Sequence, residues 1–471
     1  MFRRSIVAVG VLVLVTTAGC RSSFEGSASR DIASVAEDVA RRTGAEPPLP
    51  ESEELLASTR REILSRPLTE EAAVKLALLG NASVRASYER LGIARADLLQ
   101  AGLISNPVFS ASLKSFSAGP EVELGLAQSF VDIFFLPLRR RVAVEELAAA
   151  QAVVAKDLVR LVYDVRRGFV RIRGAQDVTK IRREGLAAVL SARDLMKKLH
   201  EAGNVRDADL TVEEVGATRA QIGVDLAELL GREAREELNV LLGLGSADPG
   251  WRLEGSLPAL PPSTITAAVE DRALGASLDL LEECARVRAA MVSAGLAQRQ
   301  GGLSHFDLGA VGKREASDGA WGFGPEISTA IPIFDTGAAK VLAASARTRE
   351  HLARHAQLSV EIGAAARRLL DRVTTLRARE RAMRETYLPL RSRLVNETTQ
   401  AFNAMQIGAF DVLDAKEAES DARREHAETL TSAWLARLDL GELLAGSLNR
   451  QRLETFAVPE PAEHPTPPKG H

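Results

Sequence analysis

The chain carries the same pattern of turn residues twice, about two hundred residues apart. A Gly-Pro-Glu sequence at residues 119–121 recurs at residues 324–326, a shift of 205 (324 − 119). Gly203 recurs as Gly408 with the same shift (408 − 203), and a weaker match pairs residues 129–132 with 332–335 at a shift of 203 (332 − 129). A repeat of this length constrains the architecture more than any single motif does. We therefore expect two halves of similar shape in one symmetric object.

The composition favours long helices and argues against nucleic-acid binding. Ala, Leu, Arg and Glu dominate, aromatic residues make up only 4% of the chain, and the net charge is −3. Chains rich in these helix formers are typical of long or coiled-coil helices. Acidic and basic residues alternate, so no basic face is available for a phosphate backbone, and few rings are available for base stacking.

The N-terminus has the features of a secretory signal. Arg3 and Arg4 precede an apolar run from residue 6 to 15, which is too short to cross a membrane as a helix. This predicts a signal peptide over residues 1–19. The small residues before Cys20 resemble a bacterial lipobox, although Thr17 departs from the usual pattern. The resemblance implies acylation of Cys20, and Arg21 after it implies transfer to the outer membrane; the alternative is a plain signal peptide with an incidental cysteine.

The remaining chain divides at changes in composition. Residues 20–66 are polar and are predicted to form a lipid-anchored N-terminal segment. Prolines near residue 260 separate a first repeat (67–255) from a second (256–450), and the Pro-rich residues 451–471 are predicted to be a disordered tail. Helices are predicted over residues 72–104, 139–199, 207–244, 264–300, 336–405 and 411–449.

Each repeat also contains two short stretches with alternating polarity. Apolar residues alternate with polar ones over residues 109–114, 121–126, 306–310 and 327–333. This period of two predicts strands with one apolar and one polar face. The polar set contains Ser110, Ser112, Lys114, Glu121, Glu123, His305 and Asp307. Without the signal sequence and the long helices, the solvated face of an ordinary sheet would be the preferred interpretation.

The ordered set of helix, two strands, long helix, break and return helix, present twice, resembles the TolC family of outer-membrane efflux proteins in its lipoprotein branch. The resemblance covers residues 68–448. It implies a mostly α fold with a small transmembrane β part: four strands per chain complete a twelve-stranded barrel in a homotrimer, continued by a long α-helical barrel through the periplasm. It also implies contact with outer-membrane lipid and no cofactor.

The resemblance further implies a function and two sets of site residues. The protein would be the passive channel of a tripartite efflux or type I secretion system, joined by a periplasmic adaptor to an inner-membrane pump of the RND or ABC type. The two helix breaks would form the tip that contacts the adaptor, and acids near them would form the periplasmic aperture. The tip set is Gly203, Asn204, Val205, Gly408, Ala409 and Phe410; the aperture set is Asp209, Asp414 and Met405.

Each of these sites has an ordinary structural alternative. A glycine at a helix end is a common C-cap, and an aspartate in a first helical turn stabilises the helix N-terminus. Asp209 and Asp414 each lie six residues after a repeated glycine, at 209 − 203 and 414 − 408. Met405 and Phe410 stand where the best-known members of the resembled family have Tyr and Arg at the gate. This difference predicts a gate that is closed mainly by apolar packing.

No catalytic or metal-binding motif emerges from the chain. It contains no HExxH, P-loop or CxxC sequence. His351 and His355 have the spacing of metal ligands on a helix, but the arginines around them indicate a solvated face. The chief alternative to a channel is a periplasmic coiled-coil adaptor or structural lipoprotein, which usually has one helical hairpin rather than two. An enzyme is the third possibility.

Overall fold

A computed structural model describes residues 26–48, 53–116, 119–245, 250–253, 255–262, 268–301, 305–314 and 320–454. The predicted signal peptide and Cys20 lie outside these residues, as does the predicted tail after residue 454. The first four residues assigned to that tail, 451–454, belong to the short helix α12 (Arg450–Glu454). The predicted tail therefore starts inside a helix.

The chain divides into two units, each described here by itself. The strand unit comprises residues 1–36, 85–156 and 278–360, and the hairpin unit comprises residues 37–84, 157–277 and 361–471. Two long helices, α5 (Val131–Glu201) and α9 (Ala338–Ala382), contribute residues to both. Further helices are α2 (Glu53–Leu64), α3 (Glu70–Gly80), α4 (Ala82–Ala101), α6 (Asp207–Leu242), α7 (Val269–Ala276), α8 (Leu278–Gln300), the π-helical turn η1 (Met383–Tyr387), α10 (Leu388–Asn403) and α11 (Ala409–Leu444), and residues 26–43 are also helical.

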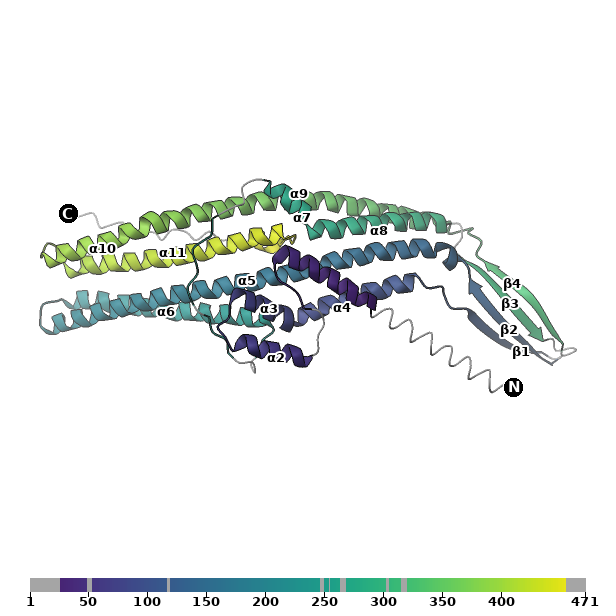
Figure 1. The fold of residues 1–471 in the computed structure, drawn as a ribbon, viewed down its shortest axis with the longest axis horizontal. Helices are drawn as coiled ribbons and strands as arrows, with labels where there is room; N and C mark the ends of the chain where they lie inside the picture. The colour runs from purple at the N-terminus through teal and green to yellow at the C-terminus, as the bar shows by residue number, and fades with distance from the viewer. Residues whose placement is uncertain are drawn as a thin grey trace. The chain divides into compact units, whose positions relative to one another are not determined.

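The strand unit contains one antiparallel sheet in the order β1-β2-β3-β4 (Figure 1). Its strands are β1 (Val108–Phe116), β2 (Gly119–Ser129), β3 (Phe306–Arg314) and β4 (Trp321–Thr329). Since Phe109 pairs with Leu126, Leu126 with Ala310 and Ala310 with Pro325, these residues share one face. The pairing thus places the alternating apolar residues of all four strands on one face of the sheet.

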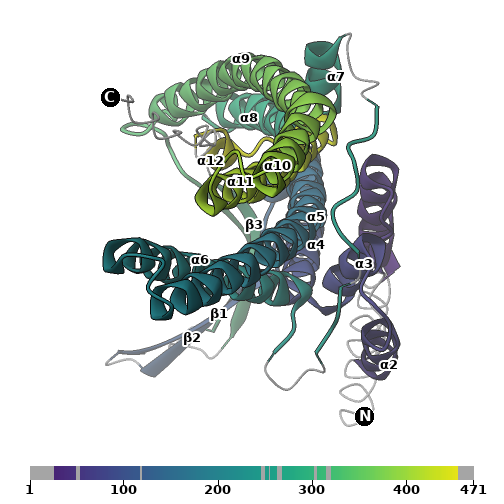
Figure 2. The same cartoon turned by 90° about the vertical axis from the view of Figure 1, so that its left-hand side faces the viewer.

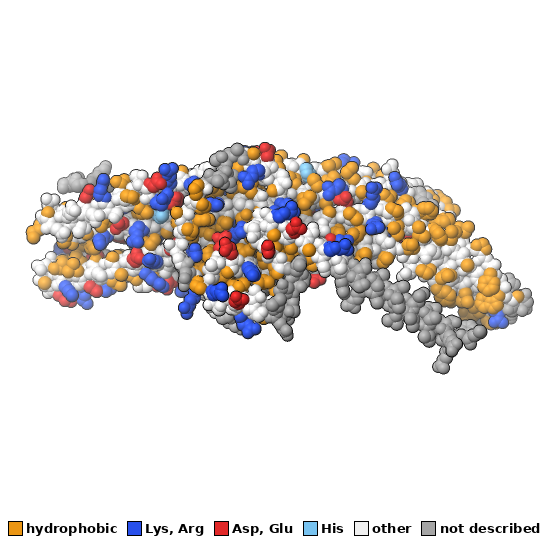
Figure 3. All heavy atoms as spheres, viewed as in Figure 1, with side chains coloured by type: hydrophobic (Ala, Val, Ile, Leu, Met, Phe, Trp, Pro, Cys, Tyr) orange, Lys and Arg blue, Asp and Glu red, His pale blue; other side chains and the backbone are white. Residues whose placement is uncertain are grey.

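The two faces of the sheet differ sharply in polarity. The apolar face carries Phe109, Leu113, Leu124, Leu126, Leu308, Phe323 and Ile327, and the opposite face carries Ser110, Ser112, Lys114, Glu121, Glu123, Asp307, Lys313 and Glu326. Hydrophobic side chains accordingly gather over the strands in Figure 3. On the polar face Lys313 Nζ lies 3.0 Å from Glu121 Oε1. The predicted apolar and polar sets are confirmed for the residues that lie inside the four strands, whereas His305 lies just before β3.

The predicted position of the fourth strand is wrong. The alternation at residues 327–333 predicted a strand there, but β4 ends at Thr329 and includes Pro325. The strand is set by its pairing with β3, in which Arg314 opposes Trp321 and Phe306 opposes Thr329. Pro325 is tolerated because β4 lies at an edge of the sheet, where an amide need not donate. Residues 119–121 begin β2 whereas residues 324–326 lie inside β4, so this repeated sequence occupies two different places.

Two predicted helices are interrupted. The helix expected over residues 72–104 breaks at Asn81, whose ψ is 122° and whose side-chain amide donates to the Leu241 carbonyl at 2.9 Å. The helix expected over residues 264–300 breaks at Ser277, which has an extended backbone with a ψ of 118°. Gly80 directly precedes the first break and Gly275 lies two residues before the second, and the sequence analysis did not use either glycine as a break signal.

The hairpin unit is built around two pairs of antiparallel helices. The α5–α6 pair and the α10–α11 pair are seen nearly end on in Figure 2. Val170 of α5 and Leu430 of α11 pack in one cluster with Leu257 of the segment between the repeats. Trp434 Nε1 donates to the Pro258 carbonyl at 2.8 Å and fixes the same segment. None of the helices in the described ranges is both long and apolar enough for a bilayer crossing.

Candidate functional site

The first helix-to-helix turn joins α5 to α6. Gly203 has a φ of +79°, in the left-handed region that favours glycine. The Asn204 amide donates to the Leu199 carbonyl at 2.9 Å. Because a left-handed residue directs the following amides back to the last helical carbonyls, it caps the helix end. Gly203 is therefore a helix C-cap, the structural role we weighed for it from the sequence.

His200 ties this turn to the start of α6. Its Nδ1 lies 2.9 Å from the Val205 carbonyl oxygen, and its Nε2 lies 3.3 Å from Asp207 Oδ1. Both ring nitrogens thus face oxygen acceptors. The sequence did not single out this histidine.

The second turn, between α10 and α11, uses different residues for the same backbone path. Met405 has a φ of +60°, and the Gln406 amide donates to the Ala401 carbonyl at 3.0 Å. Gly408 has a φ of −80° and stands at the N-cap of α11, where its amide donates to Asp411 Oδ2 at 2.9 Å. Gly408 is therefore an N-cap, and the C-cap role considered as the structural alternative for it is wrong.

The two turns match at a shift of 202 residues. This shift relates Gly203 to Met405 (405 − 203), and it relates the Leu199 acceptor to the Ala401 acceptor (401 − 199). At the same shift the counterpart of Asp209 is Asp411 (411 − 209). The equivalences at 205, which paired Gly203 with Gly408 and Asp209 with Asp414, are consequently wrong. The left-handed position of the second turn is occupied by Met405. The repeated glycines therefore do not show which residues of the two turns have the same backbone conformation.

Most of the predicted tip residues lie at the surface of the turns. Gly203, Asn204, Gly408 and Phe410 are exposed, whereas Val205 and Ala409 are half-buried. Met405 is 93% exposed, and Phe402 and Phe410 are both about two-fifths exposed. The second turn therefore presents an apolar surface, while the first presents Asn204 and a glycine.

The two predicted aperture acids have different surroundings. Arg206 donates to both carboxylate oxygens of Asp209 at 2.9 Å, and this hydrogen bonding lowers the pKa of Asp209. Within the chain Asp209 therefore stabilises the first turn of α6. Asp414 is exposed on α11 and lies close enough to Glu213 of α6 to raise its pKa.

The acids that meet across α6 and α11 are Glu213, Asp414 and Glu417. Partial burial is the largest cause of the raised pKa of Glu213, followed by repulsion from Asp414 and then from Glu417. The sequence analysis missed Glu213 and Glu417. Their spacing was a usable signal, because Glu213 lies one helical turn after Asp209 and Glu417 lies three residues after Asp414.

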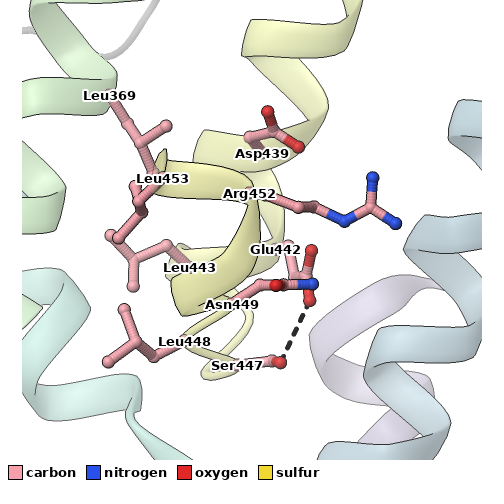
Figure 4. Close-up of a pocket in the computed structure, with 9 residues that line it drawn as sticks. All are labelled: Leu369, Asp439, Glu442, Leu443, Ser447, Leu448, Asn449, Arg452 and Leu453. Atoms are coloured by element: carbon pink, nitrogen blue, oxygen red, sulfur yellow. Dashed lines mark hydrogen bonds between the residues drawn. The ribbon is translucent and has the colours of Figure 1, made fainter. Parts of the chain in front are cut away.

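A buried ion network lies about 45 Å along α11 from the second turn, since residue 439 follows residue 409 by thirty positions. Arg167 of α5 contacts Asp164, Asp439 and Glu442 at 2.7, 3.1 and 2.7 Å. The cavity beside it measures about 10 Å³ and is lined by Asp439, Glu442, Leu443, Ser447 and Arg452 among others (Figure 4). A space of that size holds roughly one water molecule, so this cavity is no ligand pocket.

Several histidines in the described ranges lie beside acidic side chains. His351 Nδ1 lies 2.7 Å from Glu283 Oε1, and His426 Nε2 lies 3.4 Å from Glu380 Oε1. In that part of the chain no three residues among His, Cys, Asp and Glu converge to form a metal site. Asp209 and Asp414 accordingly have no metal-binding arrangement within one copy.

Comparison with known proteins finds one curated relative and several solved structures of similar fold. No family model matches the chain. The cobalt-zinc-cadmium resistance protein CzcC of Cupriavidus metallidurans is 24% identical over 397 residues, which cover 80% of this chain and 90% of CzcC.

Solved structures share the fold. The Campylobacter jejuni CmeC outer membrane channel matches with a TM-score of 0.69 and 14% identity, over 80% of this chain and 85% of that one. The outer-membrane channel OprN matches with a TM-score of 0.68 and 17% identity, over 86% and 95%. CusC matches with a TM-score of 0.67 and 18% identity, over 80% and 92%. The chain therefore shares its fold with these outer-membrane channels, and its sequence is similar to CzcC over nine tenths of the length of CzcC.

Proposed function

We propose that this chain forms the outer-membrane channel of a tripartite export system, as a homotrimeric passive conduit from the periplasm to the exterior. The sheet carries this proposal. Its apolar face exposes Phe109, Leu113 and Phe323, and its polar face carries charged side chains. Such a sheet fits a boundary between lipid and a water-filled lumen. A periplasmic coiled-coil adaptor, the alternative class, has no use for an exposed apolar sheet face.

The two edges of the sheet support a trimer. β1 and β4 are the outer strands in the order of the sheet. Unpaired strand edges are not tolerated in lipid, so β1 of one copy is expected to pair with β4 of the next. Three copies then give twelve strands, with the polar faces directed inward.

The two helical turns are the proposed docking surface for a periplasmic adaptor, which couples the channel to an inner-membrane pump of the RND or ABC type. The exposed Met405 and Phe410 give the second turn an apolar surface that a partner helix can bury. Asn204 at the first turn offers hydrogen bonds instead. Since the two turns differ, the docking surface is expected to have threefold rather than sixfold symmetry.

The carboxylates near the turns are the proposed aperture. In a trimer Asp209 and Asp414, joined by Glu213 and Glu417, place acidic side chains around one axis, and such rings favour cations. We expect Asp414→Ala to lower cation selectivity and cation block in planar-bilayer recordings. Asp207→Ala is the control, because the Asp207 side chain is 94% exposed and its Oδ1 lies 3.3 Å from His200 Nε2. Unchanged conductance and block in Asp414→Ala would place the aperture elsewhere.

Anchoring through an acyl group on Cys20 completes the proposal for outer-membrane location. Metabolic labelling with palmitate tests it, since label is expected in the wild-type protein and in Cys284→Ser but not in Cys20→Ser. Label that survives in Cys20→Ser would exclude this residue as the acylation site.

The channel function is tested by membrane fractionation and crosslinking. Outer-membrane material that migrates as a trimer before heating and as a monomer after it is expected, together with ion conductance in planar bilayers. A soluble monomer would overturn the proposal. Because CzcC is named for cobalt, zinc and cadmium resistance, divalent cations are the first cargo to test, beside organic drugs, in cells that lack the gene.

A further inference from the structure

Large apolar side chains are exposed at the two junctions that connect strands to long helices. After β2 they are Ile133 and Phe134, in the first turn of α5, and after β4 they are Ile331, Ile333 and Phe334, in the segment before α9. Phe134 is 67% exposed, Ile331 75%, Ile333 70% and Phe334 100%. We call these five residues the apolar collar. An exposed cluster of this kind usually marks a binding surface.

The two connecting segments lie at the same end of the sheet, on either side of the start of β3. The Phe130 amide donates to the Phe306 carbonyl at 2.9 Å, and the Ala330 amide donates to the His305 carbonyl at 3.3 Å. Both segments are therefore held to adjacent residues of one strand. This places the two parts of the collar at one level, although they are about two hundred residues apart in the chain.

The collar continues directly from the apolar face of the sheet. On β3 that face extends from Phe306 to Arg314, opposite Thr329 and Trp321 of β4. Nine strand residues span about 26 Å, and a tilted strand covers somewhat less of the bilayer normal. Trp321 and Phe323, whose ring centroids lie 6.1 Å apart, stand at the end near the strand turns. The collar supplies the corresponding bulky side chains at the end near the helices.

Charged residues follow the collar in both segments. Arg139 Nη1 lies 3.0 Å from Asp132 Oδ1, and Lys340 Nζ lies 3.6 Å from Asp335 Oδ2. Arg141, two residues further along α5, is exposed. Arg139 lies about 12 Å along α5 from Val131, which is a suitable distance for cations that contact phosphate groups above an apolar layer.

We propose that the apolar collar inserts into the periplasmic leaflet of the outer membrane, at the boundary between phospholipid acyl chains and headgroups. The proposal rests on the proposed channel function, because it requires the sheet to lie in a bilayer. It adds that the lipid contact does not end with the strands. Ile331, Ile333 and Phe334 act as a membrane-interface anchor, and Arg141 and Lys340 contact the anionic headgroups beyond them.

The test uses single-tryptophan variants in lipid vesicles. Trp251, Trp321 and Trp434 are replaced by Phe, and one Trp is returned by Phe334→Trp, Phe323→Trp or Met405→Trp. Each variant of the full chain is reconstituted in phosphatidylethanolamine and phosphatidylglycerol vesicles with lipids brominated either close to the headgroup or deep in the acyl chain. Because Phe334 is fully exposed, Phe334→Trp changes no internal packing.

We expect Phe334→Trp to lose emission in brominated vesicles, and to lose more with the shallow bromine than with the deep one. Phe323→Trp on the apolar sheet face should also be quenched, and Met405→Trp at the hairpin turn should not. If the emission of Phe334→Trp is not quenched, the anchor proposal is overturned. Blue-shifted emission would then mean that a neighbouring copy covers the collar, and red-shifted emission would mean that water covers it. If Phe323→Trp is also unquenched, the sheet is outside lipid and the channel function itself fails.

Discussion

Arg167 Nη1 lies 2.7 Å from Glu442 Oε2, and both side chains are only 2% exposed. The pair joins α5 to α11 inside the hairpin unit. Asp164 and Asp439 also contact the guanidinium, so one buried cation faces three carboxylates. Burial raises the pKa of Glu442 and of Asp439 even though Arg167 opposes this. Such a network is costly to break, because each remaining charge is left in a medium that solvates it poorly.

Arg167→Ala is therefore expected to lower the free energy of unfolding by about 3–5 kcal/mol. The exposed pair between Arg183 and Glu228 provides the control, since Arg183→Ala should cost at most about 1 kcal/mol. Loss of helical circular dichroism with denaturant measures both. Equal midpoints for the two variants would contradict a structural role for the network. In the double variant Arg167→Met with Glu442→Leu, much of the lost stability should return.

Gly174 of α5 permits a close approach to α11. A Cβ at this position would overlap the Thr431 side chain. Gly174→Ala should therefore destabilise the packing of the two helices by about 1–3 kcal/mol. On α6, a Cβ at Gly231 would meet no atom within 4 Å, so Gly231→Ala should stabilise by up to about 1 kcal/mol through helix propensity. Thermal unfolding of both variants tests the opposite signs, and partial rescue of Gly174→Ala by Thr431→Ala would locate the overlap.

Met405 occupies a left-handed backbone conformation that glycine adopts without strain. Met405→Gly should therefore stabilise the second turn by about 1 kcal/mol, whereas Gly203→Met should cost the first turn a similar amount. Amide hydrogen exchange is the appropriate measurement, because a turn can open locally without global unfolding. Slower exchange of the Gln406 amide is expected in Met405→Gly. No change in that amide would show that the methionine conformation is not strained.

The raised pKa of Glu213 predicts a pH-dependent stability. Because the folded-state pKa is raised, the folded chain binds the proton more tightly than the unfolded chain does. The contribution of Glu213 to stability is therefore fully present below the unfolded-state pKa of about 4.5. The free energy of unfolding then falls as the pH rises from there through the raised folded-state pKa. Glu213→Gln should reduce this loss, as seen in the melting temperature measured from low to neutral pH.

Glu385 is the control of opposite sign for that experiment. A hydrogen bond from Arg381 lowers the pKa of Glu385, so its contribution is present above the unfolded value and is lost as the pH falls. Glu385→Gln should therefore flatten the acid side of the stability profile, unlike Glu213→Gln. Identical profiles for the two variants would contradict the assigned causes.

The sequence by itself determined the order of elements and the polarity of the sheet. Alternation over residues 109–114 and 306–310 requires that apolar and polar side chains lie on opposite faces, because successive strand residues point to opposite sides. The return helix predicted over residues 207–244 matches α6, which ends at Leu242. Short-range periodicity and turn residues carry this information, so no tertiary contact was needed.

Only the tertiary structure decided which residues are equivalent and which acids meet. The repeated glycines suggested a shift of 205, but hydrogen bonds at the turns set it at 202, with Met405 in the conformation of Gly203. Pairing with β3 placed β4 over residues 321–329, and packing of α6 on α11 brought Glu213 to Asp414. Register and packing depend on contacts between distant segments, and a local sequence pattern leaves these contacts undetermined.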